Sequence, residues 1–324
     1  GYRALYNNTA NYNIAIGYDA GFAIDSGTDN IAIGAYAGDA ITTSTYNIAI
    51  GQYALSSVNT GGSNIGIGRL AGANNTTAAL NMYIGYAAGY ANQTGAGNTI
   101  VGNSSYGQSA AAPLNISNVT TLGHEAGYYA TGSYNTFVGA LAGKGNSSAP
   151  YSSGEYNTAM GYNALKAFTT GDRNVAVGPT TLGNVTTGYR NIGIGDRAGN
   201  SITSGHSGVY IGYLAGYGGN QGGNVAIGSQ ALFTANGGSN VAIGYETAKS
   251  TTANDGVWIG ANAGKDGAGG GQSVLVGHYA GQYIVGSQVT HLGREAGRYA
   301  TGSYNTFVGV SAGKGGTTSA PYSS

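Results

Sequence analysis

The chain has 324 residues, 62 of them glycine, and its twelve basic and twelve acidic side chains cancel. Without a basic excess it lacks the electrostatic footprint of a nucleic-acid or anionic-lipid binder. Cysteine is absent, which excludes disulfides, thiolate metal sites and cysteine nucleophiles. Apolar runs of four or five residues are far shorter than the roughly 20 that cross a bilayer, so we expect no membrane insertion in this segment.

A short repeat runs along the whole chain. Each copy reads Asn, aliphatic, variable, aliphatic, Gly, two variable residues, Ala, and then Gly or Leu. In chain order the copies close at Gly17, Gly34, Gly51, Gly68, Gly85, Gly102, Gly123, Gly139, Gly161, Gly178, Gly195, Gly212, Gly228, Gly244, Gly260, Gly277, Gly293 and Gly309, and Gly1 opens a truncated copy. The spacing is 16 or 17 residues at all steps but two.

This period is too short for a helical hairpin, and the apolar residues in each copy alternate with a period of two. Each copy therefore predicts one solenoid coil with short strands. The expected fold is an all-β parallel β-solenoid of about 19 coils, each of 16–17 residues. We expect one repeat domain, residues 1–324, cut as a window from a longer protein.

Two coils are longer than the others, near residues 106–118 and 145–155. Their extra residues surround Ala111-Ala112-Pro113 and Ser148-Ala149-Pro150-Tyr151. Because proline cannot donate to a strand ladder, we expect both insertions to leave the stack as loops.

The residue before each closing glycine is always Ile, Val, Leu or Met, which suits one row of a hydrophobic interior. The alanine three residues after the glycine leaves room only for a thin interior. We therefore expect this aliphatic row to point inward as the structural core: Ile16, Ile33, Ile50, Ile67, Ile84, Val177, Ile194, Ile211, Ile227, Ile243 and Ile259.

The residue between the two aliphatic positions is also apolar or small. Alternation in a strand with one buried face would place polar residues there, so a second apolar face is expected. We expect neighbouring copies to cover it in a homo-oligomer, with a trimer as the favoured state; the alternative is a monomer that tolerates alanines on its surface. The residues concerned are Ala15, Ala32, Ala49, Tyr83, Phe137, Trp258, Leu275 and Phe307.

Thirteen of the eighteen complete copies place Asn four residues before the glycine. Stacking would align these amides into a hydrogen-bonded ladder, as in cross-β stacks. Asn also suits the turn that enters the strand, and the sequence leaves both interpretations open. The first members of the row are Asn13, Asn30, Asn47, Asn64 and Asn81.

Tyrosine occurs 27 times, and two of its recurrent places are just after the closing glycine and just before the Asn. Exposed aromatic rows can stack on sugar rings or other surfaces, although the same rings can instead stack on each other or pack between chains. The candidate surface contacts are Tyr18, Tyr86, Tyr162, Tyr213 and Tyr245.

Few residues are of the types that catalyse reactions or bind metals. The four histidines, His124, His206, His278 and His291, occupy different coil positions without carboxylates at metal-ligand spacing, so we expect solvated surface residues. The glycine-rich segment 139–145 is one residue short of a phosphate loop and lacks the Ser or Thr after lysine. We predict no catalytic residue, no cofactor and no metal site, and no enzyme.

Copies such as Asn157-Thr158-Ala159-Met160-Gly161-Tyr162-Asn163-Ala164-Leu165 resemble the NTAxGxxAL repeats of phage tail fibres and large bacterial surface proteins. They are also similar to the head repeats of trimeric autotransporter adhesins. The resemblance implies β-solenoids, commonly of three chains, that carry receptor-binding surfaces.

On this basis we expect an extracellular structural fibre or adhesive shaft on a cell or virion surface, with itself and surface glycans or other receptors as partners. A phage tail fibre for host recognition is the alternative. An ice-binding solenoid is a third reading, but it needs regularly spaced threonines on every coil, and threonine here is irregular.

Overall fold

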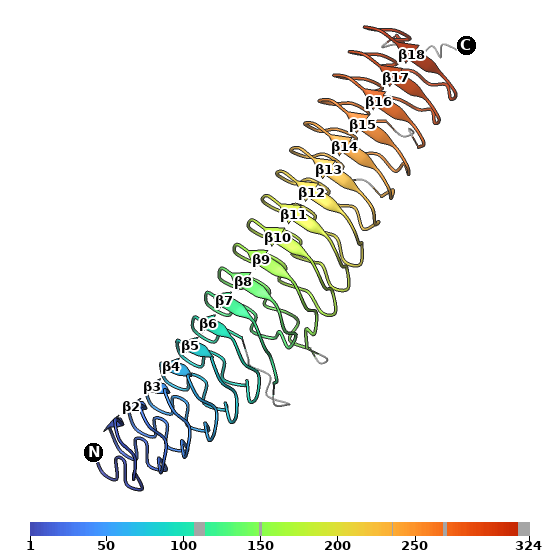
Figure 1. The fold of residues 1–324 in the computed structure, drawn as a ribbon. Coiled ribbons are helices and arrows are strands. Elements are labelled where there is room, and N and C mark those ends of the chain that lie inside the picture. Colours follow the sequence, from blue (N-terminus) through green and yellow to red (C-terminus); the bar gives the residue numbers. More distant parts are fainter. Residues whose placement is uncertain (107–113, 149–150, 235, 268–270, 317–324) are drawn as a thin grey trace. The chain divides into compact units, whose positions relative to one another are not determined.

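The computed structural model describes residues 1–106, 114–148, 151–234, 236–267 and 271–316. The chain divides into two compact units, Gly1–Thr170 and Gly171–Ser324. In each unit, three-residue strands lie one above the other, one per coil (Figure 1). No described residue is helical.

The described residues of each unit form nine strands. In the first unit they are β1 (Ile14–Ile16), β2 (Ile31–Ile33), β3 (Ile48–Ile50), β4 (Ile65–Ile67), β5 (Met82–Ile84), β6 (Thr99–Val101), β7 (Thr120–Leu122), β8 (Thr136–Val138) and β9 (Thr158–Met160). In the second they are β10 (Val175–Val177), β11 (Ile192–Ile194), β12 (Val209–Ile211), β13 (Val225–Ile227), β14 (Val241–Ile243), β15 (Val257–Ile259), β16 (Val274–Val276), β17 (Thr290–Leu292) and β18 (Thr306–Val308).

Within each unit, consecutive strands pair in parallel and in register. Ile31 pairs with Ile48 and Ala32 with Ala49, so equivalent residues of successive coils form columns. The predicted all-β parallel solenoid is confirmed. Among the described residues, each of the eighteen complete copies forms one three-residue strand, where about 19 coils were expected. The truncated copy opened by Gly1 forms turns without a strand.

The coil turns sharply after each strand. Gly34 has a φ of +127°, and a Cβ atom there would lie 2.8 Å from the carbonyl carbon of Gly51 in the next coil, so only glycine fits. Two residues after the closing glycine, the backbone is left-handed even without glycine, with φ of 57° at Tyr36 and 58° at Tyr53. The N–H of Tyr36 donates to the carbonyl of Tyr18 in the preceding coil at 2.9 Å, which holds this corner.

The interior is formed by the central residue of each strand. Ala32 and Ala49 are fully buried, whereas the flanking Ile67 and Ile259 are 36% and 38% exposed. The expectation that the residue before the closing glycine points inward is therefore wrong. Half-buried or exposed on the outer face are Ile16, Ile33, Ile50, Ile67, Ile84, Val177, Ile194, Ile211, Ile227, Ile243 and Ile259.

The cause of this reversal is the narrow interior, which is filled from two sides. Tyr83 packs between Gly72 and Gly89, and a Cβ atom on either glycine would collide with its ring. In the opposite arrangement, the small centre Gly66 faces Leu55, whose Cγ lies 2.7 Å from where a Cβ of Gly66 would be. In both arrangements a large residue on one side of the interior faces a small one on the other. Seven of the eighteen described strands have alanine at the centre.

The second apolar face expected from the sequence is this same interior. Trp258 is 1% exposed, Tyr83 and Phe137 are fully buried, and Phe307 in the last strand is half-buried. Because the coil itself covers these side chains, they give no reason for a neighbouring chain to cover them. Burial raises the pKa of Tyr83 to about 12, and Asn92 Nδ2 donates to its hydroxyl at 2.7 Å.

The Asn column lies at the entrance to the strands. Asn30, Asn47, Asn64 and Asn81 are buried and Asn13 is half-buried. Asn64 Nδ2 donates to Asn47 Oδ1 at 3.2 Å, and Asn64 Oδ1 accepts the backbone N–H of Asn81 at 3.1 Å. The same Nδ2 also donates to the carbonyl of Gly61 in its own turn at 3.2 Å. The Asn side chains therefore form hydrogen bonds both between coils, as in a ladder, and within their own turn.

The two longer coils rejoin the stack after their insertions. Leu114 forms a parallel bridge with Asn92, and Ser152 forms one with Ala130. Ala111, Ala112, Pro113, Ala149 and Pro150, where the loops were predicted, lie outside the described residues.

Candidate interaction surface

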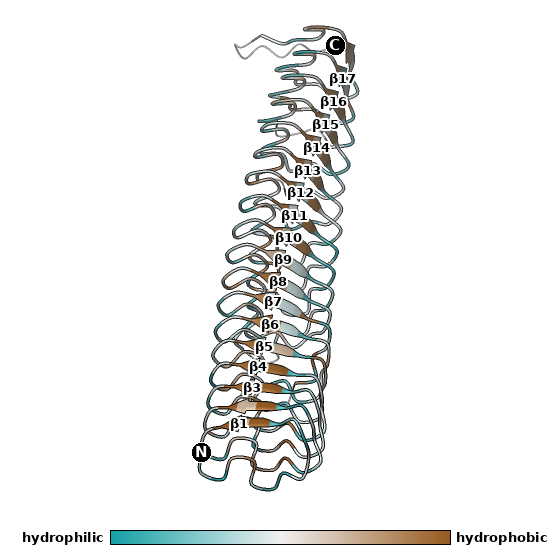
Figure 2. Ribbon diagram, turned by 60° about the vertical axis from the view of Figure 1, so that its left-hand side comes forward, coloured by the Kyte–Doolittle hydropathy of each residue, from teal (hydrophilic) through white to brown (hydrophobic). Residues whose placement is uncertain are grey.

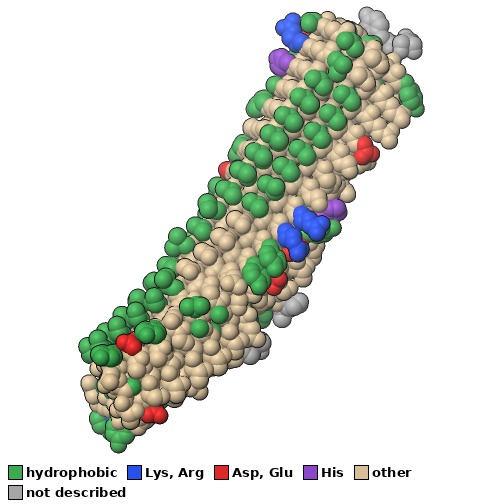
Figure 3. All heavy atoms as spheres, in the orientation of Figure 1, with side chains coloured by type: hydrophobic (Ala, Val, Ile, Leu, Met, Phe, Trp, Pro, Cys, Tyr) green, Lys and Arg blue, Asp and Glu red, His purple; other side chains and the backbone are tan. Residues whose placement is uncertain are grey.

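The outer face of the strands carries two aliphatic columns. They are the first and third residues of each strand, which point away from the interior filled by the central residue. Both are aliphatic or Met in β1–β5 and in β10–β16, whereas β6–β9, β17 and β18 begin with threonine. Figure 2 shows this change as paler strands at β6–β9, and Figure 3 shows the rows of hydrophobic side chains. We call these columns the aliphatic face.

The aliphatic face is unusually apolar for exposed surface. In β11, Ile192 and Ile194 are 39% and 40% exposed. At on the order of 60 Å² for each side chain, the fourteen side chains of β10–β16 present roughly 800 Å². The largest apolar patch of a typical monomer is about 300–600 Å², and a standard interface buries about 800 Å² per partner. The face is thus large enough for a stable protein contact.

The predicted tyrosine contacts lie beside this face, just beyond the closing glycine. Tyr18, Tyr86, Tyr162, Tyr213 and Tyr245 are 45%, 44%, 57%, 47% and 52% exposed. Some of the tyrosines stack on each other along the coils. Tyr2 and Tyr18 stack with ring centroids 5.2 Å apart, and Tyr134 and Tyr156, which precede an Asn, stack at 4.9 Å. In such pairs one ring face is already occupied by the neighbour.

Comparisons with models of protein families, with curated proteins and with solved structures give no match. A function must therefore be inferred from the surfaces of this chain.

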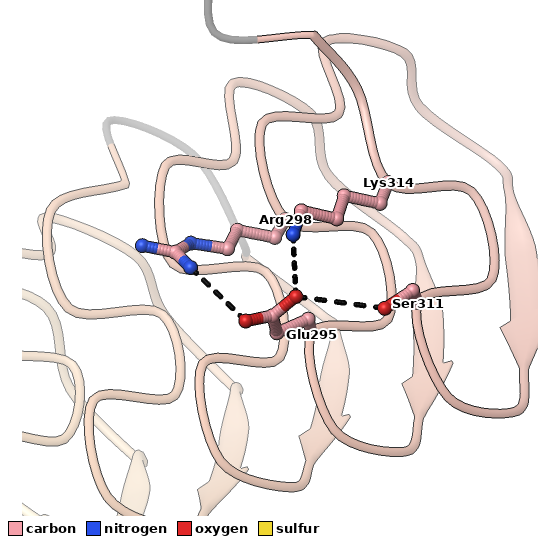
Figure 4. A network of polar contacts seen from close by, with 4 residues as sticks. All are labelled: Glu295, Arg298, Ser311 and Lys314. Atoms are coloured by element: carbon pink, nitrogen blue, oxygen red, sulfur yellow. Dashed lines mark hydrogen bonds and ion pairs between the residues drawn. The ribbon is translucent and has the colours of Figure 1, made fainter.

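The charged residues form short ion-pair ladders. Glu295 accepts from Arg298 Nη1 at 3.2 Å and from Lys314 Nζ of the next coil at 2.5 Å, and Ser311 also contacts it (Figure 4). The bond from Lys314 lowers the pKa of Glu295. Glu246 repeats the arrangement with Lys249 and Lys265, both at 2.6 Å. Neighbouring cations balance the negative charges of these carboxylates, and the ion pairs with Lys314 and Lys265 link successive coils. This arrangement suits a structural role.

One histidine departs from its expected surface position. His124, His206 and His278 are exposed, but His291 is the fully buried central residue of β17. Its ring stacks on Phe307 with centroids 4.9 Å apart, and neither ring nitrogen has a hydrogen-bond partner among the described residues. Burial lowers its pKa to about 4. The burial of His291 could have been predicted only if the central residue of each strand had been known to face inward.

His291 predicts acid sensitivity. The unfolded chain binds a proton at a pKa of about 6.5, whereas the folded ring stays neutral down to about 4, so stability falls as the pH drops through this window. The loss reaches about 3 kcal/mol near pH 4. Denaturant unfolding of the second unit's coils between pH 7 and 4 measures it. His291→Phe should flatten this slope, and equal slopes in the two proteins would contradict the assignment.

The described residues offer few candidates for a metal or ligand site. The described residues contain no group of three His, Cys, Asp or Glu side chains placed to bind a metal. In the same part of the chain, no helix has the length and apolarity of a membrane span. A cavity of about 440 Å³ beside Tyr299, Asn305 and Phe307 lies in the last described coil, where the end of the stack leaves the interior uncovered. The aliphatic face and its tyrosine border are therefore the surfaces on which a function can be built.

Proposed function

We propose that this chain is the shaft of an extracellular structural fibre, in which copies associate side by side through the aliphatic face. The observation that carries the proposal is the double aliphatic column on the outside of β1–β5 and β10–β16. In a shaft of independent monomers this face would stay in contact with water. Association would remove it from water and gain roughly 25 cal/mol for each Å² of apolar surface buried. Covering about 800 Å² on each partner is a strong driving force for association.

The favoured assembly is a trimer on a cell or virion surface. In each unit, an apolar stripe can be buried by closed rotational symmetry about an axis parallel to that stripe. The resemblance of the repeat to three-chain fibre repeats supports three copies, and it also supports the surface location. The exposed tyrosines beside the stripe are then left to contact surface glycans or other receptors, which is the adhesive part of the proposal.

An ice-binding role has weaker support. Outward threonines form a regular column only in Thr99, Thr120, Thr136 and Thr158 of β6–β9, and again in β17 and β18. The remaining strands present Ile, Val or Met at that position. An ice-binding surface would need the threonine on every coil, so the aliphatic face favours association with protein.

The double substitution Ile50→Lys with Ile67→Lys tests the proposal. Both side chains lie on the aliphatic face of the first unit, and burying a lysine against an apolar partner is costly. For the original protein, we expect a native mass that is a multiple of the mass of one chain. For the variant, we expect the mass of a single chain. The dissociation constant should rise at least about 100-fold, or about 3 kcal/mol.

Thr60→Lys is the matched control, because Thr60 is exposed in a turn away from the strands. It should leave the mass unchanged, and circular dichroism should show that all variants keep their strands. A monomeric original protein, or a double variant with unchanged mass, would overturn the proposal. A dimer would keep the association and exclude the trimer.

A further inference from the structure

The residues that follow the closing glycines form a column of their own. In this column, side chains of consecutive coils lie directly over one another. Tyr2 and Tyr18 stack with centroids 5.2 Å apart and an interplanar angle of 18°. The guanidinium carbon of Arg69 lies 5.6 Å from the ring centroid of Tyr86 in the next coil. One step along the column is thus close to the distance of one aromatic stack.

Three consecutive coils place Tyr213, Ser229 and Tyr245 in this column. Backbone hydrogen bonds fix their register: the N–H of Gln230 donates to the carbonyl of Tyr213 at 2.8 Å, and the N–H of Glu246 donates to that of Ser229 at 2.9 Å. The rings of Tyr213 and Tyr245 are 47% and 52% exposed. Neither stacks on another aromatic ring within the described part of the chain.

The residue between the two tyrosines in this column is a small serine, and we call the space between the two tyrosines the slot. Two steps of the column separate the tyrosine rings by roughly 10 Å, twice the usual centroid distance of a stacked pair. A flat ring placed midway would lie about 5 Å from each tyrosine, within the range of favourable ring contacts. Ser229, which lies between the two tyrosines in the column, has a hydroxyl that can donate or accept a hydrogen bond.

We propose that Tyr213, Ser229 and Tyr245 form a binding site for one neutral pyranose ring of a glycan. A pyranose ring has apolar faces for the two tyrosines and a rim of hydroxyl groups. Because both tyrosines are about half exposed, the outer rim of the bound ring stays in water, which suits hydroxyl groups better than the edge of a purely aromatic ligand. Asp196 precedes Tyr213 in the column, so its carboxylate disfavours acidic sugars.

This site goes beyond the proposed shaft and does not depend on the number of chains. The test is saturation-transfer NMR of the intact chain with neutral methyl glycopyranosides, beginning with the β-glucoside, at millimolar concentration. We expect transfer to the ring protons of at least one glycoside. Tyr213→Ala and Tyr245→Ala should each weaken binding at least about tenfold, since a ring held on one side loses half of its contacts.

Ser229→Tyr gives the sharper result. It should complete the tyrosine stack, fill the slot and abolish binding while raising the melting temperature, whereas Ser229→Ala should keep the slot. Tyr162→Ala removes an equally exposed tyrosine of the same column in the other unit and should change nothing. Absence of transfer for every glycoside, retained binding in Ser229→Tyr, or tighter binding of p-cresol than of any glycoside would overturn the proposal. None of these outcomes affects the mass measurements that test the shaft.

Discussion

Asn64→Ala is expected to lower the stability of the first unit by about 4 kcal/mol, far more than an average substitution. The side chain is fully buried and makes contacts in three coils. Its Nδ2 lies within hydrogen-bonding distance of Asn47 Oδ1 and of the carbonyls of Gly61 and Ala78, the last at 2.8 Å. Its Oδ1 accepts from both the backbone and the side chain of Asn81 at 3.1 Å. Alanine would remove the partner of the Asn81 amide and of the Gly61 and Ala78 carbonyls, at about 1–3 kcal/mol for each buried group before relaxation. Asn47 Oδ1 would keep the backbone N–H of residue 64, and Asn81 Nδ2 would keep the carbonyl of Gly95.

Denaturant unfolding with hydrogen exchange measures this effect, because a stack of coils need not unfold in one step. The amide of Asn81 should lose protection first, since its acceptor is Asn64 Oδ1. Asn103→Ala is the matched control: Asn103 is exposed, and its Oδ1 accepts a hydrogen bond from its neighbour Ser104. The control should cost less than about 0.5 kcal/mol. Equal stability of the two variants would show that the Asn column does not hold the coils together.

Trp258→Ala should cost about 4 kcal/mol, whereas Ile259→Ala in the next position should cost less than about 1 kcal/mol in the isolated chain. Trp258 is 1% exposed and packs against Gly256 and Gly264, so its removal leaves a cavity. Ile259 is 38% exposed on the aliphatic face. If the residue before the closing glycine were the core residue, the order of the two effects would be reversed.

Thermal or denaturant unfolding of both variants at concentrations too low for association separates the two positions. Trp258→Phe is the control for the cavity, because it keeps a ring and should recover more than half of the loss. The Ile259 substitution should instead weaken association, since its side chain belongs to the aliphatic face. A large loss of stability for Ile259→Ala under dissociating conditions would contradict the observed orientation.

The coil and its strand follow directly from the sequence. Spacing alone predicts parallel strands in register, because a constant number of residues per coil brings each residue over its equivalent. The Asn positions could also be found, because thirteen of the eighteen complete copies place an Asn four residues before the closing glycine. The sequence could not separate a ladder from a local turn, and the structure shows hydrogen bonds of both kinds.

The orientation of the strand could not be found by comparing hydrophobicity, because Ile-Ala-Ile fits either face equally well. Isoleucine is the more hydrophobic residue, but the interior is too narrow for it in most coils. A usable signal was present in the sequence. Glycine follows Ala88 in the coil of Tyr83, but leucine follows Ala54 in the coil of Ala49. In these two coils the compensation identifies the central residue as the one that shares the interior, whereas the small Ala32 is accompanied by the small Gly38. The burial of His291 follows from the same rule.

The left-handed corners at residues such as Tyr36 and Tyr53 govern how a stack can assemble. A left-handed non-glycine residue costs about 1–2 kcal/mol, and here its N–H finds its acceptor only in the preceding coil. A single coil in isolation bears this cost without the hydrogen bond that offsets it, and its interior is open on both sides. Several coils must therefore form together as a nucleus. Further coils can then be added one at a time, each using the edge before it as a template, so that growth proceeds along the stack as a moving front.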